Sequence, residues 1–411
     1  MQYPHQWNWD SAFTSLGLSH LDWRRAATEI ESLLEAQWID GMVPHIRYDP
    51  ANLDGYFPGP ARWPRAQGRA RTSGVLTSGI SNPPIAVTAA LWVGLRQPDL
   101  ILRRRFWEAV YPGLERWLRY FRERRTVGGS PLITVVHPWE SGWDNSPRWD
   151  FLRGLELSPR DPGPRRDREH VVPAQRPEDR DYGAYLALVE LLEESDYDLG
   201  RFLEVSPFAV YDVLLNAIWY RAARDLGEMA AALGRPEPFG TQDLDTFRVH
   251  FEGTLWEPSL STYVDFDIQR GRRIPVLTPA GLAASMSGLI RPERVALMWD
   301  TYLSRGLGLR PIWTADPQSA YFDPVRYWRG PVWVIVNWMV LEGLKTVGLR
   351  ARAAVLARET LRLIEEAGFA EYYDPRTGNA CGATAFSFTA ALAIQLVSAR
   401  NGEETIGVGQ P

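Results

Sequence analysis

Apolar residues recur every three to four positions along most of this chain, a spacing typical of amphipathic helices. In residues 22–38, Ala26, Ile30 and Leu33 fall on one stripe, and Asp22 stands where a helix N-cap is expected. The spacing predicts helices at 8–19, 22–38, 84–97, 99–125, 182–196, 209–234, 242–255, 279–289, 291–304, 331–347, 350–367 and 384–399. Patterns typical of strands occur at 130–137 and 261–268.

The order of these elements predicts the fold class. The helices follow one another in pairs with no strand between them, which excludes a parallel sheet of alternating strands and helices. No sequence repeat of fixed period is visible, which disfavours a solenoid. A closed ring of six helical hairpins would use twelve helices and about this length. We therefore expect an all-α (α/α)6 barrel of about twelve helices, with long functional loops on one rim.

The long connections carry the Trp, Tyr, Gly, Pro and Asp residues expected of functional loops. No shift in composition marks a domain boundary, so the sequence predicts a single catalytic domain over residues 1–411. Loop insertions are expected at about 39–82 and 126–181. The charged, proline-rich stretch 150–181 fits a mobile lid or a solvated surface excursion, and its composition favours the excursion.

Charge and hydropathy exclude several kinds of partner. The formal net charge of -5 provides no basic field for nucleic acid. No apolar run reaches the length of about 18 residues that a membrane span requires. The N-terminal residues lack the basic and apolar regions of a secretory signal, so we expect a cytoplasmic protein. The oligomeric state stays open, and a homo-oligomer is compatible with the sequence.

Three features of composition bear on chemistry. Cys381 is the only cysteine, so no internal disulfide is expected, and the metal spacings built on cysteine pairs are absent. We expect no metal and no cofactor. Lys345 is the only lysine, and this preference for arginine fits a GC-rich genome or a heat-adapted protein equally well. The 18 Trp residues suit either a Trp-rich core or a site where flat apolar ligands meet polar edges.

Five loop stretches are rich in aromatic residues, and four of them also place a carboxylate or an amide beside an aromatic ring. They are "YPHQWNWDSAF" (3–13), "QWIDGMVPH" (37–45), "ESGWDNSPRW" (140–149), "YWRGPVW" (327–333) and "EYYDPRTG" (371–378). Sugars are bound in this way, with C–H faces on aromatic rings and hydroxyls hydrogen-bonded to carboxylates. Two carboxylates on opposite walls of a cleft are also what cleavage of a glycosidic bond requires.

In this order, the five stretches resemble the motifs of glycoside hydrolase family 63 and its trehalase-like and glucoamylase-like relatives. The resemblance covers residues 3 to about 388 and implies an (α/α)6 barrel that hydrolyses with inversion at the anomeric carbon. The compact length is similar to that of the cytoplasmic members that hydrolyse mannosylglycerate or glucosylglycerate to a hexose and D-glycerate. The resemblance thus implies a small sugar-glycerate substrate.

The resemblance also implies roles for single residues. Asp144, in "SGWDNSP", matches the family's general acid, and Glu371, before the "YYDPRTG" turn, matches its general base. "RPEDRDY" at 176–182 resembles the glycerate-binding region loosely, with Arg176, Arg180 and Tyr182 as its contacts. The other expected substrate contacts are Tyr3, Trp7, Trp9, Asp10, Gln37, His45, Tyr56, Trp143, Asn145, Tyr327, Trp328 and Trp333.

The chemistry of inversion sets conditions on the two carboxyl groups. A general acid must be protonated near neutral pH, whereas the ordinary pKa of an aspartate is about 3.9. Burial beside Trp143 and a nearby Asp10 would both raise the pKa of Asp144. Glu371 has to stay ionised to deprotonate a water, and an inverting pair lies about 6.5–9.5 Å apart to hold that water.

Other interpretations remain open at this point. Asp144 can instead cap the turn Asp-Asn-Ser-Pro, and Glu371 can be an exposed carboxylate that follows a helix end at Gly368. An inverting trehalase or an α-glucosidase for short oligosaccharides would use the same two carboxylates. A non-catalytic sugar-binding protein on the same barrel is the more distant alternative.

Overall fold

The computed structural model of this protein describes residues 3–155, 157, 160, 165–169 and 171–400. In this part of the chain, six helical segments form an inner ring in which each segment packs against the next. They are α1 (Asn8–Leu21), α3 (Ile85–Arg96), α7 (Val213–Leu233), α9 (Ala280–Ala283) with the 3-10 turn η7 (Ala284–Ser287), α11 (Val334–Thr346) and α13 (Ser387–Arg400). The last helix packs against α1 and closes the ring. Helices α3 and α11 lie inside because they are apolar on almost every side.

Outer helices cover this ring and bury one face each. Within the described ranges they are α2 (Trp23–Glu35), α4 (Leu100–Arg124), α8 (Thr241–Leu255), α10 (Pro292–Ser304) and α12 (Arg350–Ala367). Each outer helix contacts the inner segment that precedes it in the chain. The predicted (α/α)6 barrel is confirmed, with five outer helices described where six hairpins were expected.

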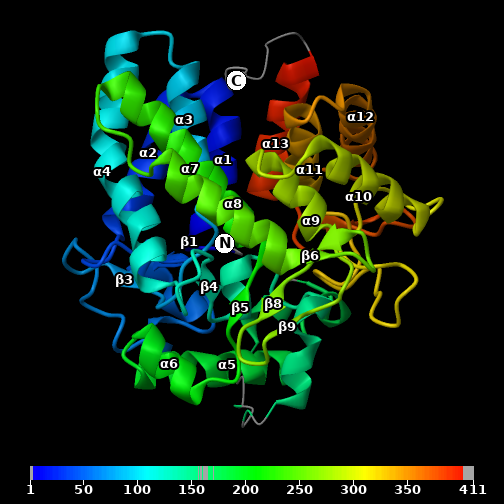
Figure 1. Ribbon diagram of the computed structural model, residues 1–411, viewed down its shortest axis with the longest axis horizontal. Helices are drawn as coiled ribbons and strands as arrows, with labels where there is room; N and C mark the ends of the chain where they lie inside the picture. The colour runs from blue at the N-terminus through cyan, green and yellow to red at the C-terminus, as the bar shows by residue number, and fades with distance from the viewer. Residues whose placement is uncertain (1–2, 156, 158–159, 161–164, 170, 401–411) are drawn as a thin grey trace.

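Two further helices lie away from the ring. Helices α5 (Asp179–Glu194) and α6 (Leu199–Val205) follow the predicted insertion and lie below the strands in Figure 1, on the side opposite the bulk of the ring helices. Short 3-10 helices fill the adjoining loops. They are η1 (Pro50–Gly55), η2 (Pro60–Arg62), η3 (Pro138–Ser141), η4 (Pro147–Gly154), η5 (Arg166–Arg168) and η6 (Pro173–Gln175).

Small antiparallel sheets order the loops that lead into the inner helices. The strands are β1 (Gln6–Trp7), β2 (Ile46–Tyr48), β3 (Leu76–Thr77), β4 (Thr134–Val135), β5 (Val210–Tyr211), β6 (Trp256–Glu257), β7 (Thr262–Tyr263), β8 (Phe266–Asp267), β9 (Arg272–Arg273), β10 (Tyr372–Tyr373) and β11 (Ala380–Cys381). The sheet orders are β1-β2-β3, β4-β5-β8-β9, β6-β7 and β10-β11. Because β1, β3, β5 and β10-β11 precede α1, α3, α7 and α13, the sheets define one rim of the barrel.

The structure corrects several predicted boundaries. The helix expected at 209–234 begins at Val213, because Val210 and Tyr211 pair in a sheet and the Asp212 carboxylate caps the helix at the Leu215 amide, 2.6 Å away. The helix expected at 279–289 is the short α9 followed by η7. The helix expected at 331–347 begins at Val334, because Trp333 has an extended backbone.

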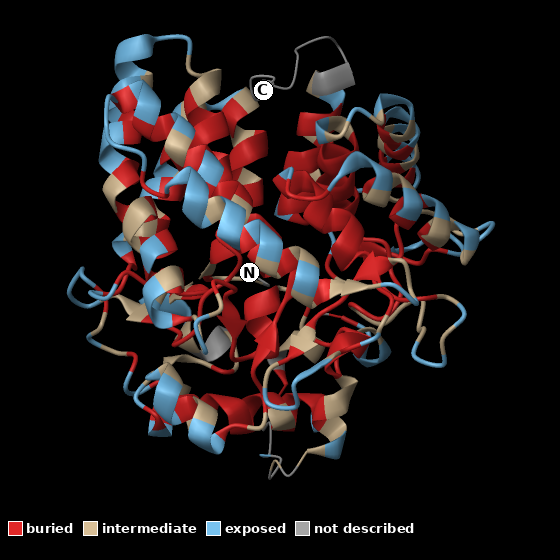
Figure 2. Ribbon diagram, in the orientation of Figure 1, coloured by how far each residue is buried: buried red, intermediate tan, exposed pale blue. Residues whose placement is uncertain are grey.

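Closure of the ring depends on a close approach of α1 to α13. A Cβ atom at Gly17 would lie 2.3 Å from the Ala391 Cα, a distance that packed atoms do not tolerate. Glycine therefore lets the first and last described helices touch along their backbones. Figure 2 shows the buried residues concentrated on the inner helices and the strands, with exposed residues on outer helices such as α8 and α12. No helix in the described part of the chain is long and apolar enough to span a membrane.

Candidate active site

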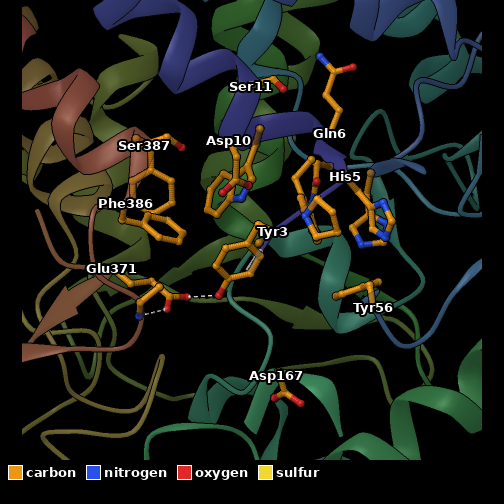
Figure 3. Close-up of a pocket in the computed structure, with 18 of the residues that line it drawn as sticks. Tyr3, His5, Gln6, Asp10, Ser11, Tyr56, Asp167, Glu371, Phe386 and Ser387 are labelled. Carbon is orange, nitrogen blue, oxygen red and sulfur yellow. Dashed lines mark hydrogen bonds between the residues drawn. The ribbon is translucent and has the colours of Figure 1, made fainter. Parts of the chain in front are cut away.

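A cavity of about 910 Å³ opens among the loops that lead into α1, α3, α11 and α13. Residues far apart in the chain meet there, and Figure 3 shows Tyr3 pointing toward Glu371 with Asp10 and Tyr56 on neighbouring walls. Thirteen predicted site residues line this cavity: Tyr3, Trp7, Trp9, Asp10, His45, Tyr56, Asp144, Arg176, Tyr182, Tyr327, Trp328, Trp333 and Glu371.

The loop that carries Asp144 is held by hydrogen bonds on both sides. Upstream, the Trp143 amide donates to the Ser141 hydroxyl at 3.0 Å, and the Tyr185 hydroxyl donates to the Asp144 carbonyl at 2.7 Å. Downstream, buried Arg148 donates to the carboxylates of Asp212 and Asp265 at 2.7 and 2.9 Å. Asp212 is the N-cap of α7, so this ion cluster fastens the loop to the inner ring.

Gly142 allows the same loop to approach the start of α1. Its φ of 73° lies in the left-handed region, where a residue with a Cβ is strained. A Cβ there would also lie 2.3 Å from the indole ring of Trp9. Glycine is therefore required both by the backbone and by the contact that brings the Asp144 loop against Trp9.

Burial is the main reason that the pKa of Asp144 is raised, to about 8. The negative charges of Asp10 and Glu371 raise it further, while Arg176 opposes the shift. The carboxyl group is therefore largely protonated at neutral pH, the state that proton donation to a leaving group requires. The pKa of Asp10 is raised to about 7, again by burial first and by the charge of Glu371 second.

Glu371 is buried and has hydrogen-bond donors on both carboxylate oxygens. Arg176 donates to Oε1 at 3.0 Å and to Oε2 at 2.8 Å, a bidentate ion pair. The Tyr3 hydroxyl also donates to Oε1 at 3.1 Å, and the Ala383 amide donates to Oε2 at 2.8 Å. The Glu371 amide in turn donates to the Ala383 carbonyl, so the β10-β11 hairpin fixes the position of the carboxylate.

Arg176 reaches the cavity from the described end of the predicted insertion. Neighbouring Gln175 accepts a hydrogen bond from the Gly382 amide at 2.9 Å through its side chain, and its carbonyl accepts from the Tyr372 hydroxyl at 2.7 Å. The Arg176 guanidinium lies over the Tyr327 ring, 4.9 Å from its centre. This part of the insertion is thus packed into the site, unlike a solvated excursion; residues 156, 158–159, 161–164 and 170 lie outside the described residues.

A stack of four aromatic rings joins the neighbours of the two carboxylates. Trp143 stacks on Trp328 with ring centres 5.1 Å apart, and Trp328 stacks on Trp333 at 3.9 Å. Trp333 stacks in turn on Tyr372 at 4.7 Å. Because Trp143 precedes Asp144 and Tyr372 follows Glu371, the stack sets how far apart the two carboxyl-bearing loops can lie.

Four predicted site residues do not line this cavity. Gln37 is buried in the scaffold, where its amide donates to the Gly41 and Gly113 carbonyls at 2.8 Å each. Trp143 lies in the aromatic stack, and the Asn145 side chain accepts from the Trp328 amide at 3.0 Å. Exposed Arg180 lines a separate cavity of about 180 Å³ and donates to the Arg153 carbonyl. The "RPEDRDY" stretch thus brings Arg176 and Tyr182, but not Arg180, to the larger cavity.

His5 and Trp139 line the cavity but were not among the predicted contacts. The Asp49 amide donates to His5 Nδ1 at 3.0 Å, so the ring proton lies on Nε2, which has no partner within the described ranges. Burial lowers the pKa of His5, which keeps the ring neutral. The alternation of Tyr3, His5 and Trp7 in an extended segment was a signal for this residue, because alternate side chains share one face. Trp139 stacks on His45 with ring centres 6.2 Å apart.

The described residues include no cluster of His, Cys, Asp and Glu side chains suited to a metal ion. Asp144 and Glu371, the carboxyl groups predicted for acid–base chemistry, both line this cavity. Asp144 is set up to donate a proton, and Glu371 lies with Tyr3 and Arg176 in the same cavity.

Comparison with known proteins decides the family. A family model described as the mannosylglycerate hydrolase MGH1-like glycoside hydrolase domain matches residues 3–389. The chain belongs to this glycoside hydrolase family. A mannosylglycerate hydrolase of Thermus thermophilus is 40% identical to this hydrolase over 399 residues, covering 95% of this chain and 94% of that one. A glucosylglycerate hydrolase of Mycolicibacterium hassiacum is 34% identical, and the match covers 95% of this chain and 91% of that one.

Solved structures agree with this assignment of the hydrolase. A crystal structure of a family 63 mannosylglycerate hydrolase from Thermus thermophilus, in complex with Tris and D-glycerate, has a TM-score of 0.89. It is 39% identical, and the match covers 96% of this chain and 93% of that chain. The neutral trehalase of Saccharomyces cerevisiae, at 14% identity and a TM-score of 0.62, shares the fold. The resemblance to family 63 seen in the sequence is confirmed.

Proposed function

We propose that this glycoside hydrolase cleaves 2-O-(α-D-mannosyl)-D-glycerate, 2-O-(α-D-glucosyl)-D-glycerate or both, with inversion at the anomeric carbon. The observation that carries the proposal is the pairing of Asp144, whose pKa is raised to about 8, with Glu371 in one cavity that also contains a buried arginine. The two relatives named for hydrolysis of a mannosyl and a glucosyl glycerate support this substrate class.

Asp144 acts as the general acid in this mechanism. Its carboxyl proton passes to the glycosidic oxygen as the bond to the anomeric carbon breaks, so that D-glycerate leaves with a hydroxyl group. Glu371 takes a proton from the water that attacks the opposite face of the sugar. The products are the β-hexose and D-glycerate, and Asp144 and Glu371 then exchange protons with solvent to restore the starting state.

The glycerate carboxylate binds at Arg176 in this proposal. Arg47 and Arg176 are the arginines that line the cavity within the described residues, and Arg47 is already paired with Glu35 at 2.9 Å. The Arg176 Nε has no hydrogen-bond partner in the described part of the chain, so the guanidinium retains a donor for a ligand. Tyr182, on the same wall, supplies a hydroxyl beside the leaving group.

The sugar ring binds against the aromatic walls. Trp7, Trp9, Trp328 and Trp333 provide flat apolar surfaces for its C–H faces, and Asp10 accepts hydrogen bonds from its hydroxyls. A neutral disaccharide, as in a trehalase, would offer no carboxylate to the Arg176 guanidinium, which favours an anionic substrate. We propose that the reaction takes place in the cytoplasm.

The test incubates the protein with mannosylglycerate, glucosylglycerate and trehalose and follows the released anomer by NMR. We expect the β-hexose from a hexosylglycerate and no turnover of trehalose. Asp144→Asn should lower kcat by roughly 10²–10⁴-fold while substrate binding persists, because proton donation to the glycerate oxygen is lost. Initial release of the α-anomer, or full activity of Asp144→Asn, would contradict the proposal.

A further inference from the structure

Protein donors occupy the acceptor positions of the carboxylate proposed as general base. Arg176 covers both of its oxygens, and the Tyr3 hydroxyl and the Ala383 amide take the remaining acceptor positions. The side chains of Arg176 and Glu371 are only 3% and 2% exposed, so water does not screen the pair. In this arrangement, Glu371 has no free lone pair directed at a nucleophilic water.

A general base has to accept the water's proton as the new bond to carbon forms. A buried guanidinium held against both oxygens occupies the acceptor positions that the water needs. Turnover therefore requires that Arg176 loosen its hold on Glu371.

We propose that the carboxylate of the leaving group releases the base: on binding, it takes over Arg176 from Glu371. This inference rests on the function proposed above and adds a reason for its specificity. An aglycone without a negative charge can enter the same cavity, but it leaves the ion pair in place. Selection for an anionic aglycone then acts on kcat as well as on binding.

The surroundings allow this exchange of partners. When Arg176 moves, Glu371 keeps the hydrogen bonds from Tyr3 and Ala383, so the carboxylate stays anchored and gains room for one water. The guanidinium can rotate away from Glu371 while it remains over the Tyr327 ring, and its Nε has no partner within the described residues. Binding adds one negative charge to the cavity: the glycerate anion pairs with Arg176, and Glu371 keeps its charge with hydrogen bonds from Tyr3, the Ala383 amide and the water.

Hexosyl fluorides allow the release of Glu371 from Arg176 to be tested with a substrate that has no glycerate leaving group. Hydrolysis of an α-hexosyl fluoride breaks the C–F bond without an aglycone, and the attacking water still delivers a proton to Glu371. The glycerate position then stays empty and can be filled by added D-glycerate. We expect D-glycerate to raise kcat for fluoride release several-fold in the wild-type protein, with chloride at the same ionic strength having no effect.

Arg176→Gln provides the second arm of the experiment. This variant should release fluoride several-fold faster than the wild type without D-glycerate, and it should not respond to added D-glycerate. On a hexosylglycerate, its kcat/KM should fall about 10–100-fold, because a charge-assisted contact to the carboxylate is lost. The matched control is Arg160→Gln, which removes an exposed arginine paired with Glu190 and should change none of these values.

The outcomes distinguish this inference from the function on which it rests. Hydrolysis of hexosylglycerate and of the fluoride, with no acceleration by D-glycerate, would overturn the release of the base and leave the proposed function intact. Failure to hydrolyse either compound would overturn the function itself. Because the D-glycerate titration uses the wild-type protein, it decides the question even if Arg176→Gln does not fold.

Discussion

Three of the carboxyl groups that line the cavity lie in clearly different environments. Burial raises the pKa of Asp144 to about 8 and that of Asp10 to about 7, whereas Glu371 has a buried arginine against both oxygens. The positive charge thus lies on the wall that needs an ionised base. The residue types alone do not distinguish a proton donor from a proton acceptor, and the position of Arg176 does.

The raised pKa of Asp144 predicts the alkaline limit of activity. The catalytic form is protonated, so it is complete below the raised pKa and is lost as the pH rises through about 8. We expect kcat/KM for a hexosylglycerate to fall roughly tenfold per pH unit above that value. In pH profiles measured with an α-hexosyl fluoride, kcat/KM should not show this alkaline decrease, because fluoride leaves without a proton.

Asp10→Asn provides the control for the alkaline limit. It removes a negative charge that raises the pKa of Asp144, so the alkaline decrease should move to lower pH. If the alkaline decrease in kcat/KM is unchanged in Asp10→Asn, or also occurs with the fluoride, a group other than Asp144 controls that decrease.

At the scale of single elements, the loops before the inner helices carry the site. The Asp144 loop depends on η3 and on Gly142, which ends this 3-10 helix in a left-handed conformation against Trp9. Gly142 therefore cannot be replaced without strain, because the Cβ of any other residue would contact the Trp9 indole ring.

Gly142→Ala should therefore be strongly destabilising. The left-handed backbone costs about 1–2 kcal/mol with a Cβ present, and forcing the Cβ against Trp9 adds about 1–3 kcal/mol. Chemical denaturation measures the loss, and kcat should fall with it because the Asp144 loop is displaced. Gly128→Ala is the matched control, since φ there is 60° with nothing within 4 Å, and it should show the backbone cost alone. Equal losses in the two variants would rule out the contact with Trp9.

Much of this architecture could be predicted from the sequence, and the parts that could not have physical causes. Helical periodicity identified every ring segment, because each buries a continuous face. Strand patterns were expected at 130–137 and 261–268, where β4, β7 and β8 lie, but the other strands were missed because segments of two or three residues are too short for a period to appear. Motifs predicted that Asp144 and Glu371 share a cavity, and both line it, but nothing local distinguishes Arg176 from Arg180. Their difference depends on Gln175 bonding to the β10-β11 hairpin, a contact across about 200 residues of chain.

At the scale of the whole molecule, ring closure brings the ends of the described chain into one site. Tyr3, in the segment before α1, meets Glu371, in the connection between α12 and α13, because α1 and α13 pack together. The active site thus depends on the contact between Gly17 and Ala391, which lies within the barrel wall.

Gly17→Ala tests this dependence. Overpacking at the α1–α13 contact should lower the free energy of unfolding by about 1–3 kcal/mol, even though alanine favours a helix more than glycine. Gly227→Ala, in α7 with nothing within 4 Å, should instead raise stability by about 0.5–1 kcal/mol. Denaturant titration of both variants is the measurement. If Gly17→Ala is more stable than the wild type, the packing between α1 and α13 can accommodate an added methyl group, which would contradict this prediction.

The stack of Trp143, Trp328, Trp333 and Tyr372 also gives this protein an intrinsic optical signal. Indole emission depends on the polarity and water content around the ring, and Trp328 and Trp333 form part of the cavity wall. A hexose that displaces water from that wall changes the emission of these rings directly. Occupancy of the cavity can therefore be followed in the unlabelled protein, before any bond is broken.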